Sequence, residues 1–117
     1  MVYIGAIVLK AANTTRAADF WRQAVTYEPG SNPDFLLPIE TGRPRLHLDE
    51  TDETHLDLWV AEDEQQDAEI ARLEALGAVR VPWTYPEDAD FVVLADPDGN
   101  RFCVINRGQA GARADGT

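Results

Sequence analysis

The chain has 117 residues, 44% of them hydrophobic, and 21 acidic side chains oppose 10 Lys and Arg side chains, which gives a formal net charge of −11. This length predicts a single domain with a real hydrophobic core. The acidic excess would repel nucleic acid and anionic lipid, so we expect neither as a partner. The single cysteine, Cys103, excludes an intrachain disulfide and fits a reducing compartment. We therefore expect a cytoplasmic protein.

The first half of the chain predicts a strand, a helix and further strands. Residues 2–10 are largely apolar and β-branched, which is typical of a strand. Asn13 and the two threonines after it offer side-chain oxygens that cap a following helix. The apolar stripe of that helix contains Ala17, Phe20, Trp21 and Ala24. A turn-forming segment at 28–33 then leads to predicted strands at 35–40 and 45–49.

The second half predicts the same kinds of element. Residues 54–61 form the clearest strand, in which Leu56, Leu58 and Val60 alternate with His55, Asp57 and Trp59. Residues 63–76 form the clearest helix, with Asp63 and Gln66 as a capping box and Gly77 as a left-handed cap. Strands follow at 78–81, 91–95 and 101–106. The last two are joined by a tight turn at 96–100, where Gly99 supplies a positive φ.

The order strand, helix, three strands thus occurs twice and indicates an internal duplication. A shift of 49 residues superposes apolar positions of the two strand–helix units. These pairs are Ile7 with Leu56, Leu9 with Leu58, Ala11 with Val60, Trp21 with Ile70, and Ala24 with Leu73. We expect one domain over residues 1–107, with modules at about 1–49 and 54–107. Residues 108–117 have the composition of a disordered tail.

Three segments carry a family resemblance, namely AADFWRQAV, HLDLWVAEDEQQDAEIARLEALGA and FVVLADPDGNRFCVI. They resemble the vicinal oxygen chelate superfamily of glyoxalases, bleomycin-resistance proteins and extradiol dioxygenases. The chain is most similar to the small glyoxalase-like domain proteins. The resemblance implies an α+β fold of two βαβββ modules, whose mixed sheet curls into a cup with the helices on its convex side. It also implies a small-molecule ligand on the concave face and a homodimer.

The resemblance further implies where a metal would bind, because metal-dependent members hold a divalent ion with residues of the first, fourth, fifth and eighth strands. The fifth-strand position falls on His55, whereas the first-strand position falls on Ala6 and the eighth-strand glutamate on Cys103. His47 is the fourth-strand candidate. Alanine cannot bind a metal, so we expect the usual tetrad to be broken and no cofactor. A zinc site of His47, His55 and Cys103 is the alternative, since all three are zinc ligand types.

Strand alternation assigns the candidate ligand-binding residues. If His55 faces the ligand, so do Asp57 and Trp59, and on neighbouring strands Arg45, His47, Arg101 and Cys103. An acid–base site would use His55, with Asp57 orienting the imidazole and Arg101 holding an anionic group. The sequence contains no nucleophile motif, phosphate loop or HExxH motif that would point to another chemistry.

Three functions stay open at this point. The first is a glyoxalase-like ligand-binding protein or divergent enzyme of unknown substrate that lacks the metal tetrad. The second is a metal-dependent lyase or dioxygenase of the glyoxalase type. The third resembles bleomycin resistance, in which the aromatic rings of Trp59, Trp83 and Tyr85 would sequester a cationic ligand.

Overall fold

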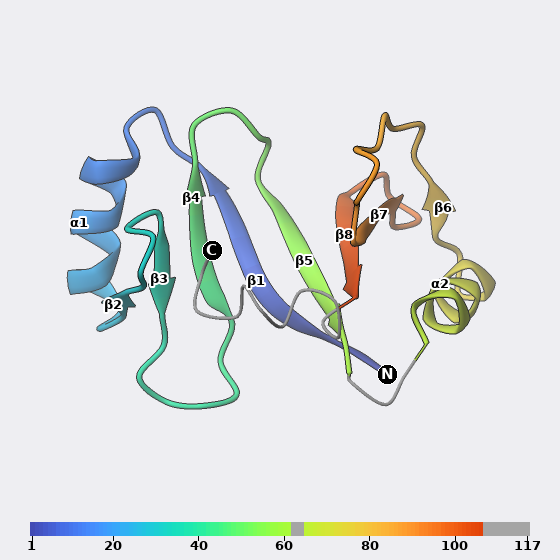
Figure 1. The fold of residues 1–117 in the computed structure, drawn as a ribbon, viewed down its shortest axis with the longest axis horizontal. Coiled ribbons are helices and arrows are strands. Elements are labelled where there is room, and N and C mark those ends of the chain that lie inside the picture. The colour runs from blue at the N-terminus through green and yellow to red at the C-terminus, as the bar shows by residue number, and fades with distance from the viewer. Residues whose placement is uncertain (62–64, 107–117) are drawn as a thin grey trace. The chain divides into compact units, whose positions relative to one another are not determined.

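The computed structural model describes residues 1–61 and 65–106, and within them the element order is strand, helix and three strands, twice (Figure 1). This order confirms the α+β class and the two βαβββ modules. The chain divides into two compact units. Of the described residues, one unit contains Gly5–Thr54, and the other contains Met1–Ile4 together with 55–61 and 65–106.

The first unit contains α1 (Thr14–Ala24) and the strands β2 (Glu28–Pro29), β3 (Phe35–Leu37) and β4 (Arg45–Asp49). It also contains the part of β1 (Val2–Lys10) that begins at Gly5. β1 runs parallel to β4, and β4 and β2 both pair antiparallel with β3. The side chain of Asn13 accepts a hydrogen bond from the Arg16 backbone N–H at 3.0 Å, so the predicted cap is confirmed. The segment 28–33 was expected to be turn only, but Glu28–Pro29 forms a two-residue strand because β3 offers it a partner.

The core of this unit contains Leu36, Leu46 and Leu48, and Ala17, Ala18 and Trp21 of α1 pack against it. The predicted helix stripe is wrong at two positions, since Phe20 is 61% exposed and Ala24 is also exposed. The cause is the rotation of α1, which directs Trp21 to the leucines. Phe20 then lies edge-on against the Trp21 ring, with 5.1 Å between centroids.

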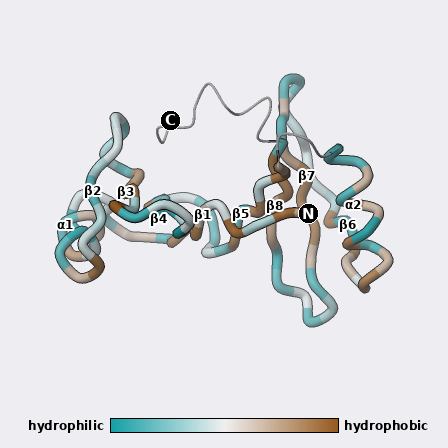
Figure 2. The backbone as a smooth tube through the Cα atoms, turned by 90° about the horizontal axis from the view of Figure 1, so that it is seen from below, coloured by the Kyte–Doolittle hydropathy of each residue, from teal (hydrophilic) through white to brown (hydrophobic). Residues whose placement is uncertain are grey.

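The second unit contains β5 (His55–Val60), α2 (Gln66–Ala75), β6 (Val79–Arg80), β7 (Phe91–Ala95) and β8 (Arg101–Asn106). β5 runs parallel to β8, and β8 and β6 both pair antiparallel with β7. Val60, Leu94 and Val104 form its core with Ile70 of α2. Hydrophobic residues are concentrated along β7 and β8 (Figure 2).

Most local predictions for this unit are confirmed, including the positive φ of 116° at Gly77 and 88° at Gly99. Leu56 alternates on the same side as Val60 but is 38% exposed, because it lies at the opposite end of β5 from Val60, which packs with Ile70. The predicted capping residue Asp63 and the predicted tail at 108–117 lie outside the described residues. The helix begins at Gln66, preceded by Gln65 without a side-chain cap.

The duplication extends to the strand register. Ile7 of β1 pairs with Leu46 of β4, and Leu56 of β5 pairs with Phe102 of β8. Since Leu56 follows Ile7 by the 49-residue shift, each module pairs its first and last strands at equivalent positions. His47 of the first module is therefore equivalent to Cys103 of the second. The pair Ala6 and Arg45 is likewise equivalent to His55 and Arg101.

Candidate functional site

The β5–β8–β7 sheet of the second unit has two chemically different faces. The face beneath α2 carries Val60, Leu94 and Val104. Residues that pair across strands point to the same side, and successive residues alternate between sides. We call the opposite side the His55 face, which comprises His55, Asp57 and Trp59 of β5, Arg101, Cys103 and Ile105 of β8, and Phe91 and Val93 of β7.

His55 lies between two charged side chains. It is 7% exposed, and its Nδ1 is 3.3 Å from Nη2 of Arg101. Its Nε2 is 3.2 Å from Oδ1 of Asp57. A guanidinium can only donate hydrogen bonds, so Nδ1 accepts from Arg101 and carries no proton. The imidazole is therefore neutral, with its proton on Nε2 beside the Asp57 carboxylate.

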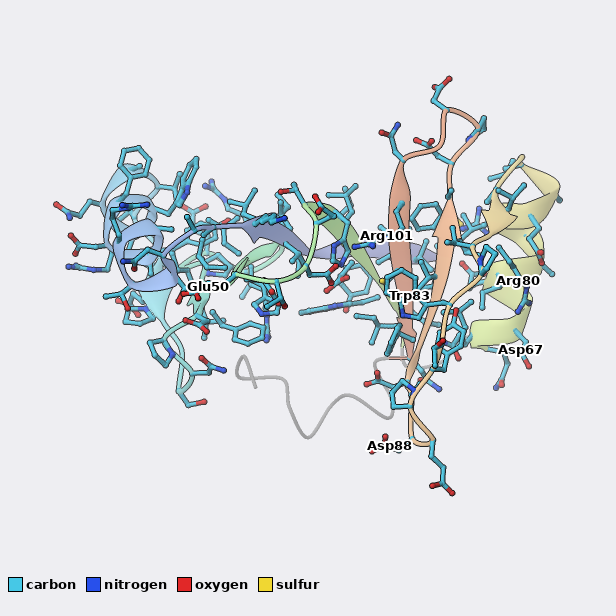
Figure 3. All side chains as sticks on the ribbon, turned by 90° about the horizontal axis from the view of Figure 1, so that it is seen from above. Glu50, Asp67, Arg80, Trp83, Asp88 and Arg101 are labelled. Carbon is cyan, nitrogen blue, oxygen red and sulfur yellow. The ribbon has the colours of Figure 1, made fainter. Side chains whose placement is uncertain are left out.

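Arg101 is held from a second direction by an aromatic ring. Its Cζ lies 4.8 Å from the ring centroid of Trp83, which is a cation–π distance. Figure 3 shows Arg101 and Trp83 next to each other beside β7 and β8, whereas Arg80 lies toward α2. Trp83 belongs to the loop between β6 and β7 and is 41% exposed.

Tyr85 anchors that loop to the sheet. Its hydroxyl oxygen accepts a hydrogen bond from the Val93 backbone N–H at 2.8 Å. Its ring packs against Phe91, with 5.4 Å between centroids. Tyr85 therefore fixes the loop that places Trp83 over Arg101, and its own hydroxyl is already engaged.

Cys103 adds a thiol beneath these charged groups. It is buried, forms no disulfide and pairs in register with Asp57 on the neighbouring strand. One ligating atom each from His55, Asp57 and Cys103 lies within 4.8 Å of the others. The second unit thus contains a compact group of nitrogen, oxygen and sulfur donors with a guanidinium at its edge.

The His55 face changes from polar to apolar along the strands. His55 and Arg101 lie at the start of β5 and β8, and Asp57 and Cys103 form the next pair. Trp59 and Ile105 follow, and Ile105 pairs with Phe91 of β7. Tyr3 contacts the Trp59 ring edge-on, with 5.9 Å between centroids.

Arg45 and His47, which the sequence also suggested as ligand-binding residues, belong to the other unit. The His47 ring stacks on Phe35 at 4.1 Å between centroids, with 12° between planes. Its Nε2 is 3.7 Å from Oδ2 of Asp49. The backbone N–H of Asp52 is the main cause that lowers the pKa of Asp49, and Thr51 and His47 lower it further.

The structure therefore brings together seven of the predicted site residues within one unit, namely His55, Asp57, Trp59, Trp83, Tyr85, Arg101 and Cys103. Sequence reasoning missed Phe91 and Tyr3, the aromatic neighbours of Tyr85 and Trp59. Alternation along 91–95 would have placed Phe91 on this face once its pairing with Ile105 was known.

The donor types of this group suit zinc, but their arrangement does not fit a bound ion. A metal ligand needs a nitrogen lone pair, and the lone pair of His55 accepts from Arg101. The Arg101 guanidinium also places a positive charge against the same imidazole, which opposes a divalent cation. In the first module the equivalents of His55 and Asp57 are Ala6 and Val8, neither of which can bind a metal, and His47, the equivalent of Cys103, is the one ligand type left there.

Paired βαβββ modules, each closed by a parallel pairing of its first and last strands, define a class of small α+β ligand-binding and enzyme folds. The model of the glyoxalase-like domain matches residues 6–105. The chain therefore belongs to the glyoxalase-like domain family, and the resemblance to the vicinal oxygen chelate superfamily is confirmed. No curated protein matches the chain.

The chain is similar to solved structures at low sequence identity. An NAD-dependent benzaldehyde dehydrogenase from Legionella pneumophila has a TM-score of 0.62 and 18% identity, and the match covers 86% of this chain and 96% of that one. A member of the glyoxalase/bleomycin resistance protein/dioxygenase superfamily from Sphaerobacter thermophilus has a TM-score of 0.37 and 16% identity, with 91% and 98% covered. At 18% identity the likeness to the Legionella structure shows the fold alone. Neither described helix is long and apolar enough to cross a membrane.

Proposed function

We propose that this protein binds a small organic molecule on the His55 face of its second module without the metal tetrad of the glyoxalases. The observation that carries the proposal is the contact of Arg101 with Nδ1 of His55 at 3.3 Å. This contact supports a role of His55 as a partner of the Arg101 cation in place of a metal ligand. The proposal includes a homodimer, as the family resemblance implies, and a cytoplasmic location, which the single cysteine fits.

His55 acts in this proposal as a positioning residue. It is almost fully buried, and both of its ring nitrogens face charged neighbours. Arg101 and Trp83 are more exposed than His55 and present the polar end of the face to a ligand. Trp59, Ile105 and Phe91 are half-buried and present its apolar end.

The two other functions considered from the sequence have less support. A metal-dependent lyase or dioxygenase would require Arg101 to leave Nδ1 of His55. Sequestration of a cation would use the Trp83 ring, but the guanidinium of Arg101 already lies over that ring. The hydroxyl of Tyr85 likewise accepts from Val93 and serves the loop.

Ligand mapping by NMR tests the proposal. Uniformly ¹⁵N-labelled protein is titrated with a library of small anionic, neutral and cationic aromatic compounds. We expect bound compounds to shift the amide signals of 55–59 and 101–105 and the indole signals of Trp59 and Trp83. Shifts confined to the first unit, or a library without any binder at millimolar concentration, would contradict the proposal.

A further inference from the structure

We propose that the first unit contains a further binding site, which takes a zwitterion of dipeptide size in a pocket between α1 and the β2–β3 hairpin. We call it the α1 pocket. α1 lies beside β2 and β3 (Figure 1). The volume of the pocket is about 440 Å³, within the range of about 300–1,000 Å³ of small-molecule sites. All of its lining residues belong to the first unit, so this inference goes beyond the proposed function.

Four charged residues line the α1 pocket, and they divide into a bonded pair and two single charges. Nη2 of Arg22 donates to Oδ1 of Asp19 at 2.7 Å, so this pair is satisfied within α1. Within residues 1–61 and 65–106, neither the guanidinium of Arg16 nor the carboxylate of Asp34 has a hydrogen-bond or ion-pair partner. The pocket therefore offers a ligand one cation from α1 and one anion from the loop before β3.

Hydrogen bonds of the main chain hold both of these residues in place. The Arg16 backbone N–H donates to the Asn13 side chain at 3.0 Å. The Asp34 backbone N–H donates to Oδ1 of Asn32 at 2.9 Å, and the Asp34 carbonyl accepts from the Leu48 N–H at 2.8 Å. Because only the two side chains have to be ordered when a ligand binds, the entropy cost of binding is reduced.

Apolar groups make up much of the remaining lining of the pocket. Leu36 belongs to the buried core of the unit, and Ala18 packs against that core. Pro29 and Pro33 line the hairpin side, where the proline ring fixes the backbone φ. These groups suit an aliphatic side chain on the ligand.

The balance of charges in the pocket selects a zwitterion. Two arginines and two aspartates line it, so their formal charges cancel, whereas the whole chain has a formal net charge of −11. An anion would gain Arg16 but would be repelled by the chain as a whole. An amine would gain Asp34 but would leave Arg16 without a partner. A dipeptide satisfies both, because one peptide unit separates its amine from its carboxylate.

The experiment compares three probes that differ only in charge, namely alanyl-leucine, N-acetyl-alanyl-leucine and alanyl-leucine amide. Each is titrated into the ¹⁵N-labelled full chain at about pH 6.5, where a terminal amine is protonated, and followed by NMR. Arg16 is exposed and Asp34 half-buried, so each charge contact is partly screened by water. We therefore expect alanyl-leucine to bind about three- to tenfold more tightly than either blocked form, with amide shifts within 13–36.

Two variants assign the two charges. Arg16→Gln should bind alanyl-leucine and its amide equally, and Asp34→Asn should bind alanyl-leucine and its acetylated form equally, because each variant loses the partner of one terminus. Arg43→Gln and Glu40→Gln are the matched controls. Arg43 and Glu40 form an ion pair at 2.9 Å in the same unit, outside the α1 pocket, so both controls should leave the affinity unchanged.

Three results would overturn the inference. The first is a blocked form that binds the α1 pocket of the unmodified chain as tightly as alanyl-leucine does, a result that stands whether or not the variants fold. The second is unchanged affinity for alanyl-leucine in Arg16→Gln or Asp34→Asn. The third is alanyl-leucine at millimolar concentration without a shift in 13–36. Shifts confined to 55–59 and 101–105 would belong to this third result and would leave the proposed function standing.

Discussion

The burial of His55 between two charged groups predicts a specific cost for its replacement. His55→Leu keeps a side chain of similar size but removes the acceptor of Arg101 and the nitrogen beside Asp57, at 3.3 Å and 3.2 Å. The hydrogen bond to the charged Arg101 contributes about 1.5–3 kcal/mol, and the close contact with the Asp57 carboxylate adds to it. The Asp57 side chain is only 15% exposed, so water replaces little of what it loses. We expect the free energy of unfolding to fall by about 2–4 kcal/mol.

The assay is urea unfolding at neutral pH, followed by tryptophan fluorescence and by circular dichroism. His47→Leu is the matched control, because the His47 side chain is 25% exposed, whereas that of His55 is 4% exposed. A leucine there keeps an apolar contact with Phe35, so the expected loss is below about 1 kcal/mol. The assigned role of the Arg101–His55–Asp57 contacts would be refuted if the two variants lost the same free energy of unfolding. It would also be refuted if His55→Leu left the free energy of unfolding unchanged.

Three further predictions concern the frame around the site. Leu94→Ala should lower the free energy of unfolding by about 2–5 kcal/mol in urea titrations, because Leu94 is 0% exposed, whereas Leu76→Ala at a 70% exposed position should cost less than about 0.5 kcal/mol. Gly77→Ala should destabilise more than Gly99→Ala in thermal melts, because both residues have positive φ but only at Gly77 would the new Cβ lie 3.1 Å from Cγ of Pro97. Because the pKa of Asp49 is lowered, its ionised form stabilises the fold above the ordinary aspartate pKa, and this contribution is lost as pH falls through the lowered pKa. Asp49→Asn should therefore flatten that part of the curve of unfolding free energy against pH. A curve that the substitution leaves unchanged would disprove the effect.

Much of the fold could be predicted because hydrophobic periodicity and turn chemistry are local signals. The alternation over 54–61 correctly separated His55, Asp57 and Trp59 from Val60, and Asn13, Gly77 and Gly99 carry the predicted cap and turn conformations. The strand at Glu28–Pro29 was missed because two residues with turn composition become a strand only when β3 pairs with them.

The candidate site could be predicted only in part, for a similar reason. Alternation places residues on a face but does not set which side chains meet. The contact of Trp83 with Arg101 joins a loop to a strand 18 positions away, and the position of that loop depends on the hydrogen bond between Tyr85 and Val93. The rotation of α1 that exposes Phe20 is likewise a packing outcome, since Phe20 and Trp21 fit a helix stripe equally well.

Elemental analysis of untagged protein purified without chelator tests most directly whether Arg101, and not a metal ion, occupies the lone pair of His55. We predict zinc, iron, nickel and manganese far below one equivalent per chain, both in the unmodified protein and in His55→Ala. Stoichiometric metal in the unmodified protein that is lost in His55→Ala would contradict the claim.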